Sequence, residues 1–126
     1  MKLNLDCIRD ILLQLENLEF DSYTTTSKLS EILNYSSDEI EYSCLKLYEA
    51  GYIDAMVIKT MNRFLPGIKS IHDITYDGHE FLSTIRDNNN WKVIKDRAKT
   101  IGVFSLKTIS QIGVSYINSL INNPNL

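Results

Sequence analysis

The sequence predicts a mainly α-helical protein with one small β-hairpin, and two observations support this prediction. Apolar residues recur every three or four positions along most of the chain, which is the spacing of amphipathic helices. The pattern changes after residue 51, where residues 52–60 and 68–74 form two short runs rich in β-formers. We therefore expect helices before and after a single hairpin.

Composition places the chain among globular proteins of one domain. Its 126 residues and 44% hydrophobic share suffice for a packed core. The net charge of −3 and the pI near 5.3 provide no global electrostatic case for binding nucleic acid. The two cysteines, Cys7 and Cys44, lie among apolar residues, which favours buried thiols in the reducing cytoplasm and no disulfide. Neither a signal peptide nor a membrane-crossing run is expected.

The first helix is expected over residues 5–15, where Leu5, Ile8 and Ile11 begin one apolar stripe. Asn4 precedes this stripe as a candidate N-cap, and Asp6 suits the positive end of the helix dipole. The helical period breaks in residues 18–26, LEFDSYTTT, whose β-branched and aromatic residues favour a short strand or a turn.

Residues 26–51 predict two helices joined by a short turn, which is a candidate helix-turn-helix. Thr26 or Ser27 caps the first helix, and Asn34 in the left-handed conformation ends it. The second helix starts with the capping-box spacing of Ser36 and Glu39 and stops at Gly51. The apolar residues of the first helix are Leu29, Ile32 and Leu33, and those that the second helix buries are Ile40, Cys44, Leu47 and Tyr48.

The hairpin connection is expected from Thr60 to Gly67, with Pro66 and Gly67 at the two central positions of a type II turn. Thr75 then caps a helix whose buried face is Phe81, Leu82 and Ile85. Gly78 costs helix propensity, so we expect a neighbouring element to approach closely there.

The pair His79–Glu80 begins like a zinc-protease motif but does not complete it. That motif requires a second histidine four residues after the first, and Ser83 occupies this position. We therefore expect no metal, no cofactor and no catalytic residue. The chain also has no glycine-rich phosphate loop, no nucleophile motif and no recognisable pair of carboxylates, so we expect no enzyme.

The C-terminal part predicts a polar hinge at residues 86–91, a basic helix over Trp91–Lys99 and a final helix capped by Ser105. The apolar stripe of the final helix is wider than packing against one small core requires, which predicts a homodimer contact. The alternative is that this helix folds back over residues 5–15. The candidate dimer residues are Leu106, Ile109, Gly113, Tyr116, Ile117 and Leu120.

The order helix, short strand, helix, turn, helix, hairpin, helix resembles that of a winged helix. LKLYEAGYID, residues 45–54, is similar to the end of the recognition helix in bacterial winged-helix regulators. ITYDGHEFL, residues 74–82, resembles the helix that follows their wing. The resemblance implies a winged helix-turn-helix domain over residues 1–87, with residues 88–126 as a helical extension packed on it.

Three longer stretches resemble a small family of Gram-positive bacteria and their phages that is catalogued as a domain of unknown function. They are MKLNLDCIRDILL at the start, LYEAGYIDA in the middle and ITYDGHEFLSTIRDNNNW before the C-terminal helices. This resemblance implies a winged-helix-like protein, often encoded in prophage regions. It implies no activity, so no functional residues come with it.

The sharpest functional hypothesis is a transcriptional regulator that binds double-stranded DNA as a dimer. The acidic Asp38, Glu39 and Glu41 oppose this hypothesis, because they lie at the start of the helix that would enter the groove. The close alternative is a module that binds a protein partner through an acidic winged-helix scaffold. The candidate DNA-binding residues are Ser37, Tyr42 and Lys46 on this helix, Lys59, Arg63 and Lys69 on the wing, and Lys92 and Lys95 in the basic segment, which also holds Arg97 and Lys99.

Overall fold

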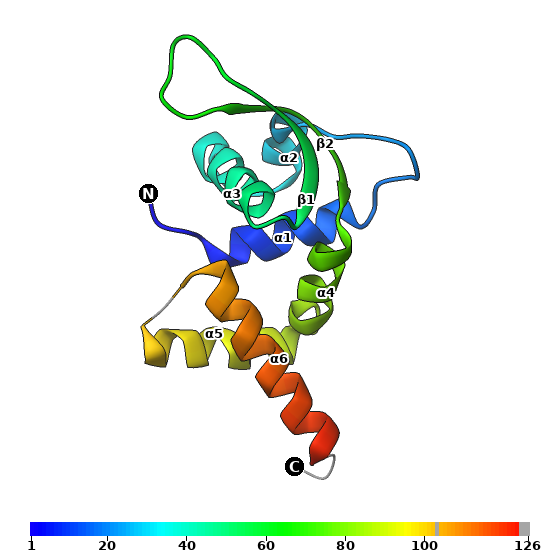
Figure 1. Cartoon of the computed structure of the whole chain (residues 1–126), viewed down its shortest axis with the longest axis vertical. Helices are drawn as coiled ribbons and strands as arrows, with labels where there is room; N and C mark the ends of the chain where they lie inside the picture. Colours follow the sequence, from blue (N-terminus) through cyan, green and yellow to red (C-terminus); the bar gives the residue numbers. More distant parts are fainter. Residues whose placement is uncertain (103, 124–126) are drawn as a thin grey trace. The chain divides into compact units, whose positions relative to one another are not determined.

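A computed structural model describes residues 1–102 and 104–123 and confirms a mainly α-helical protein with one two-stranded antiparallel hairpin (Figure 1). Its elements are α1 (Leu5–Leu15), α2 (Thr26–Ile32), α3 (Ser37–Glu49), β1 (Ile53–Ile58), β2 (Gly67–Ile74), α4 (Tyr76–Ile85), α5 (Asn88–Ile101) and α6 (Leu106–Asn122). The chain forms two compact units, Met1–His79 and Glu80–Leu126. The boundary between the two units falls within the α4 segment of the sequence.

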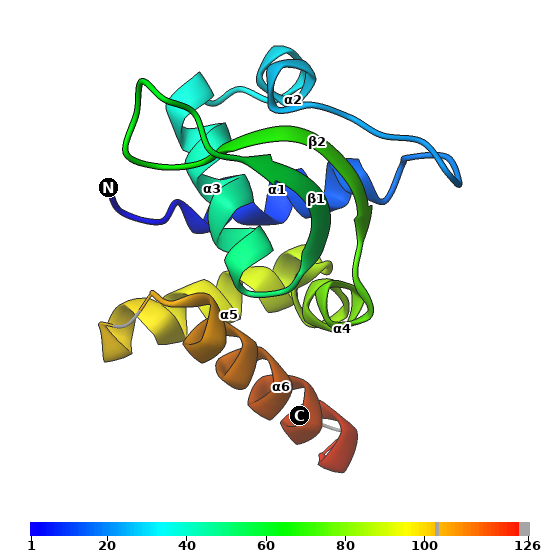
Figure 2. The same ribbon diagram turned by 45° about the horizontal axis from the view of Figure 1, so that its top comes forward.

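Helix α1 begins where the sequence predicts. The side chain of Asn4 accepts a hydrogen bond from the backbone N–H of Cys7 at 3.1 Å, which satisfies one of the free donors of the first turn. Ile8, Ile11 and Leu12 are fully buried, and α1 packs against α3 within the first unit (Figure 2). The apolar stripe of α1 is therefore core.

Helix α2 starts one residue earlier than expected, because Thr25 rather than Thr26 or Ser27 is its cap. Thr25 is extended, and its hydroxyl accepts from the N–H of Lys28 at 3.2 Å. The predicted left-handed conformation of Asn34 is wrong. Leu33 ends the helix in an extended conformation, and Asp21 is the one non-glycine residue with positive φ in the described part of the chain. The chain therefore leaves α2 in an extended conformation, without a left-handed residue at Asn34.

Helix α3 is capped as predicted, with Ser36 Oγ accepting from the N–H of Glu39 at 3.2 Å. It ends before Gly51, whose φ of +79° is the left-handed conformation that glycine adopts without strain. The predicted burial of Tyr48 is wrong, since its side chain is 41% exposed. Leu45 is buried instead, and it borders a hollow that residues of the connection between the two strands also line.

The two strands pair from Ile53 opposite Ile74 to Ile58 opposite Gly67, with two irregularities in register. On the other side of β2, Thr24 and Ile71 exchange two backbone hydrogen bonds of 2.9 Å. The segment around Thr24, which was predicted as a short strand or turn, thus lies beside β2, and β1 lies beyond β2. Gly67 belongs to β2 and has no positive φ, so the predicted type II turn at Pro66–Gly67 is wrong.

Gly78 allows the close approach that the sequence predicts. The hydroxyl of Thr75 caps α4 by accepting from the N–H of Gly78 at 3.1 Å, and it donates to the carbonyl of Gly51 at 2.5 Å. A Cβ atom on Gly78 would lie 2.6 Å from Cγ2 of Ile74 and would overlap the carbonyl oxygen of Tyr52. The start of α4 is therefore pressed against the start of the hairpin.

In the second unit, the expected polar hinge at residues 86–91 is wrong, because Asp87 caps α5 and brings the asparagines into its first turn. The carboxylate of Asp87 accepts from the N–H of Asn90 at 2.9 Å. Trp91, Ile94 and Ala98 form the buried face of α5. Helix α6 starts at its predicted cap, where Ser105 Oγ accepts from the N–H of Thr108 at 3.2 Å.

Candidate binding surfaces

The exposed face of α3 carries the three side chains predicted to read bases. Ser37 is exposed, while Tyr42 and Lys46 are partly exposed. Lys46 Nζ lies 5.3 Å from the centre of the Tyr42 ring and 2.8 Å from Glu49 Oε2. The hydrogen bond to Glu49 raises the pKa of Lys46 above its ordinary value. Lys46 is therefore charged but already paired.

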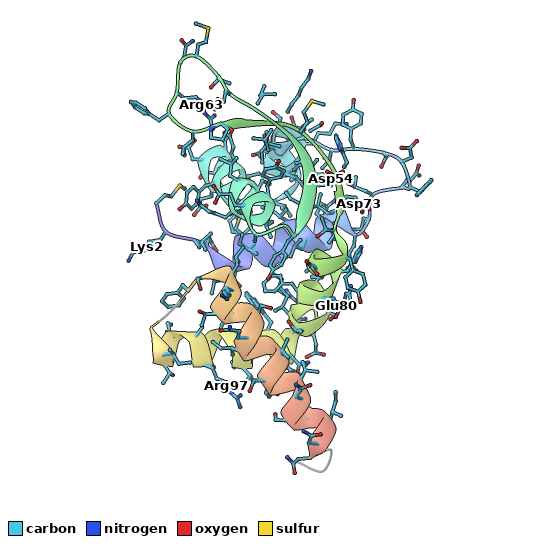
Figure 3. All side chains as sticks on the ribbon, in the orientation of Figure 1. Lys2, Asp54, Arg63, Asp73, Glu80 and Arg97 are labelled. Atoms are coloured by element: carbon cyan, nitrogen blue, oxygen red, sulfur yellow. The ribbon has the colours of Figure 1, made fainter. Side chains whose placement is uncertain are left out.

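Arg63 connects the strand-to-strand loop to α3 (Figure 3). Its guanidinium donates to Glu41 Oε1 at 2.9 Å and to the carbonyl oxygens of Leu65 and Pro66, each at 2.9 Å. All of these groups come from within the protein, so Arg63 acts as a positioning residue for the loop. Sequence reasoning missed this role, although an acidic helix followed by a loop arginine was the available signal.

A hollow of about 320 Å³ lies between α3 and this loop. Asp38 and Tyr42 line it from α3, together with the apolar Leu45, Phe64 and Leu65. Phe64 and Met61 of the same loop are otherwise fully exposed. The loop thus combines an apolar surface with an acidic neighbour.

Lys59 and Lys69, the remaining candidates on the hairpin, are both exposed. Lys59 begins the loop after β1, and Lys69 lies on β2. Neither forms a salt bridge with any residue that the structure describes. Their ammonium groups are therefore available to bind an anion, whereas Lys46 and Arg63 are already paired with glutamates.

The hairpin histidine is engaged in a local network. His72 Nε2 lies 2.8 Å from Ser70 Oγ, and His72 Nδ1 lies 3.5 Å from Asp54 Oδ2. Within residues 1–102 and 104–123, no three His, Cys, Asp or Glu side chains gather in a way that could hold a metal ion. Cys7 and Cys44 are free, buried thiols. Burial raises the pKa of both, that of Cys44 to about 12.

In the second unit, the basic candidates lie on α5. Lys92 and Lys99 are exposed, and Lys95 is partly exposed with its ammonium 5.4 Å from the centre of the Trp91 ring. The spacing of these three lysines places them on one helix face. Arg97 points elsewhere and stacks on the Tyr116 ring at 5.0 Å. The three lysines and the arginine of α5 therefore lie on different faces of the helix.

The predicted dimer residues divide into two groups. Leu106, Ile109 and Gly113 are buried within the chain itself, so these residues are unavailable for contact with a second copy. Gly113 packs against Thr84 and Ile94 of the same unit. Tyr116, Ile117 and Leu120 are partly exposed. The apolar stripe is wide because one part of it is core, and a dimer contact stays a prediction for the rest.

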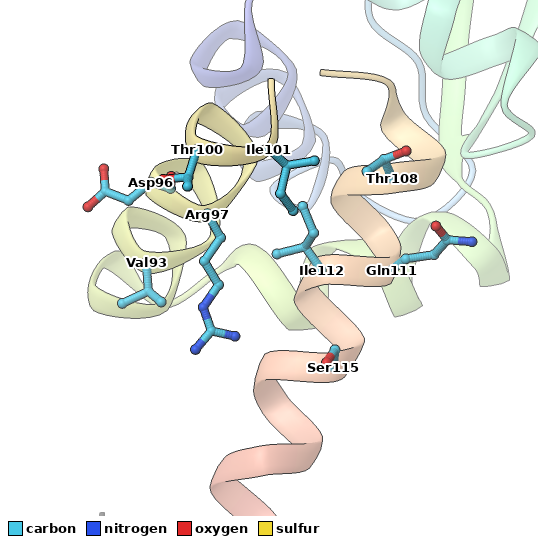
Figure 4. A pocket seen from close by; sticks show the side chains of 9 residues that line it. All are labelled: Val93, Asp96, Arg97, Thr100, Ile101, Thr108, Gln111, Ile112 and Ser115. Carbon is cyan, nitrogen blue, oxygen red and sulfur yellow. The ribbon is translucent and has the colours of Figure 1, made fainter. Parts of the chain in front are cut away.

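A groove of about 650 Å³ runs between α5 and α6 (Figure 4). Its apolar lining comes from Val93 and Ile101 on α5 and Ile112 on α6, while Asp96 and Arg97 provide its two charges. Sequence reasoning missed this groove, because its lining comes from two helices and the expected face of the first of them did not include Val93 or Ile101.

No helix in the part of the chain that the structure describes is both long and apolar enough to cross a membrane.

Comparison with known proteins places this chain in a family. Residues 2–104 match the family model described as "Hypothetical protein (DUF2513)". A protein of Haemophilus influenzae, described as an uncharacterized protein, is 30% identical over 123 residues, which covers 96% of this chain and 99% of the relative. No solved structure matches the chain significantly.

Proposed function

Because the chain belongs to the DUF2513 family, whose description states no activity, we propose its function from its geometry: a non-enzymatic winged-helix regulator that binds double-stranded DNA. The arrangement of the first unit carries this proposal. Its elements run α1, the Thr24 segment, α2, α3 and then the hairpin, and the segments lie side by side in the order Thr24, β2, β1. Two helices joined by a short turn and followed by an adjacent hairpin are the arrangement of a winged helix, and this arrangement supports the proposal.

The charges on α3 are less unfavourable than the sequence suggests. Glu41 is paired with Arg63, and Glu49 is paired with Lys46. Glu39 accepts a hydrogen bond from the Asn4 amide at 3.4 Å, which turns it toward the start of α1. Among the acidic side chains of α3, Asp38 is therefore the main one left to repel the phosphates of a duplex. Ser37 and Tyr42 offer polar groups for bases.

In this proposal, side chains of the hairpin contact the DNA phosphates. Lys59 and Lys69 are exposed and unpaired among the described residues, and Arg63 holds the loop between them in place. Each phosphate contact releases counterions, so binding through these lysines would weaken as salt rises.

Fluorescence anisotropy of a labelled mixed-sequence duplex, measured with the full chain at several salt concentrations, tests the proposal. We expect a steep loss of affinity with salt, and Lys59→Ala with Lys69→Ala should reduce the slope by about two units. Lys107→Ala, an exposed lysine on α6, is the matched control and should leave the slope unchanged. Absence of binding by the parent at low salt contradicts the proposal.

A second candidate, binding to a protein partner, is favoured by the loop itself. Met61 and Phe64 are fully exposed beside the half-exposed Leu65, and clustered apolar side chains often mark a protein interface. Phe64→Ser distinguishes the candidates. It should leave the salt dependence of DNA binding intact if the lysines hold phosphates, and it should abolish capture of a protein partner if the loop is that interface.

A further inference from the structure

The groove between α5 and α6 leaves large apolar side chains in water. Ile101 is 60% exposed, and Val93 and Ile112 are only partly covered. Figure 4 shows Ile101 and Ile112 directed toward one another from the two helices. Exposing such a surface is unfavourable unless something covers it, because removing apolar area from water is favourable.

The distribution of charge around the groove suits a contact between two copies of the chain. From Thr108 to Asn122, α6 contains no Asp, Glu, Lys, Arg or His. In a two-fold interface each residue near the axis lies close to its own equivalent, so a charge there would repel itself. The uncharged residues Thr108, Gln111 and Ser115 that line the groove avoid this repulsion.

The two charges at the groove are of opposite sign and adjacent in sequence. In Figure 4, the carboxylate of Asp96 points outward at the rim, and the guanidinium of Arg97 lies between the helices. In the described residues Arg97 contacts the Tyr116 ring and forms no salt bridge. In a two-fold dimer, the Asp96 carboxylate of each copy would therefore be able to pair with the Arg97 guanidinium of the other.

We propose that this groove is the contact between two copies of the chain, in which two α5–α6 pairs form a four-helix arrangement. Val93, Ile101 and Ile112 of both copies form its apolar centre, and Asp96 of each copy pairs with Arg97 of the other. Two-helix units commonly bury their apolar faces in this way. The inference does not depend on DNA binding.

The other exposed apolar edge of α6 supplies the control. Val114 lies outside the α5–α6 groove and is 47% exposed, so it resembles Ile112 in size and helix but not in position. A charge at Val114 should be tolerated, whereas a charge at Ile112 should be buried without a partner.

Sedimentation equilibrium of the full chain from low to high micromolar concentration tests the proposal. We expect a dimer, and Ile112→Glu should raise its dissociation constant roughly 100-fold, whereas Val114→Glu should leave it unchanged. Ile101→Glu is the second variant if Ile112→Glu loses its circular dichroism, because Ile101 contributes little to the protomer core. A monomeric parent, or dissociation by Val114→Glu alone, overturns the proposal.

Charge reversal tests the pairing itself. Asp96→Arg and Arg97→Glu should each weaken the dimer roughly tenfold, and the double variant should regain most of the parent's affinity. Additive weakening in the double variant overturns the pairing of Asp96 with Arg97.

Discussion

The two compact units differ in charge and in what they offer a partner. Residues 1–79 carry seven basic and thirteen acidic side chains, a net charge of −6, whereas residues 80–126 carry six basic and three acidic ones, a net charge of +3. The first unit holds α2, α3 and the hairpin, through which we propose DNA binding, and the second holds the lysine face of α5. Under this proposal the shape and the charge that suit DNA are divided between the units, so total charge does not decide between the two candidate functions.

The units also differ in how they use a glycine for close packing. Gly78 faces backbone, because a Cβ there would overlap the carbonyl of Tyr52. Gly113 faces a side chain, because a Cβ there would lie 2.7 Å from Oγ1 of Thr84. The backbone carbonyl of Tyr52, which accepts a hydrogen bond from the N–H of Thr75, can move less than a rotatable hydroxyl, so the first unit should tolerate the added methyl group less well.

Gly78→Ala should therefore have the largest effect on stability. We expect a loss of about 3 kcal/mol in the free energy of unfolding, at the upper end of overpacking effects. Urea unfolding checks this, with labelling of the Cys44 thiol reporting the first unit and emission of Trp91 reporting the second. A stability within about 0.5 kcal/mol of the parent would show that the junction of α4 and the hairpin can relax.

The lysines of α5 test whether the proposed DNA binding needs both units. Lys92→Ala, Lys95→Ala and Lys99→Ala together should lower the salt slope of DNA affinity by about three units if all three contact phosphates. The hairpin variant Lys59→Ala with Lys69→Ala is measured in parallel. An unchanged slope for the α5 variant would restrict DNA binding to the first unit.

Alkaline pH should destabilise the first unit, which contains both cysteines. Burial raises the pKa of Cys44 from its ordinary 9.0 to about 12, so above pH 9 the unfolded chain releases a proton that the folded chain retains. The free energy of unfolding should then fall as pH rises, by up to about 1.4 kcal/mol per pH unit for this thiol. Burial, together with the hydrogen bond to Asp10, also raises the pKa of Tyr35, which acts in the same direction.

Urea unfolding at about pH 8 and about pH 10 measures this effect. Cys44→Ala should show a smaller fall in stability between the two pH values than the parent does. An equal fall in both proteins would mean that Cys44 does not cause the pH dependence.

Gly113→Ala should have the smallest effect, a loss of about 1 kcal/mol, because the Thr84 side chain can move away. The hydroxyl of Thr84 donates to the carbonyl of Phe81 at 2.8 Å, and a rotation would sacrifice this bond. Thr84→Ala in the same chain should remove most of the cost of Gly113→Ala. A cost equal to that of Gly78→Ala in urea unfolding would contradict the contrast between the units.

The sequence by itself predicted the elements whose causes are local. Asn4, Ser36, Thr75 and Ser105 cap their helices as expected, because each cap joins a side chain to a backbone N–H three residues away. Gly78 was also recognised, since a glycine within a helical pattern indicates close packing. Asp87 was missed, because the asparagines that follow it resemble a loop by composition while the cap makes them helical.

Only the tertiary structure decided which of the candidate binding residues are available. Arg63 is drawn to Glu41, 22 positions earlier in the chain. Leu106 and Ile109 became core rather than surface, and Ile101 and Ile112 became the two sides of one groove. The periodicity of a helix shows that a residue lies on an apolar face. It cannot show which part of that face another helix will cover, because this depends on contacts between segments that are distant in sequence.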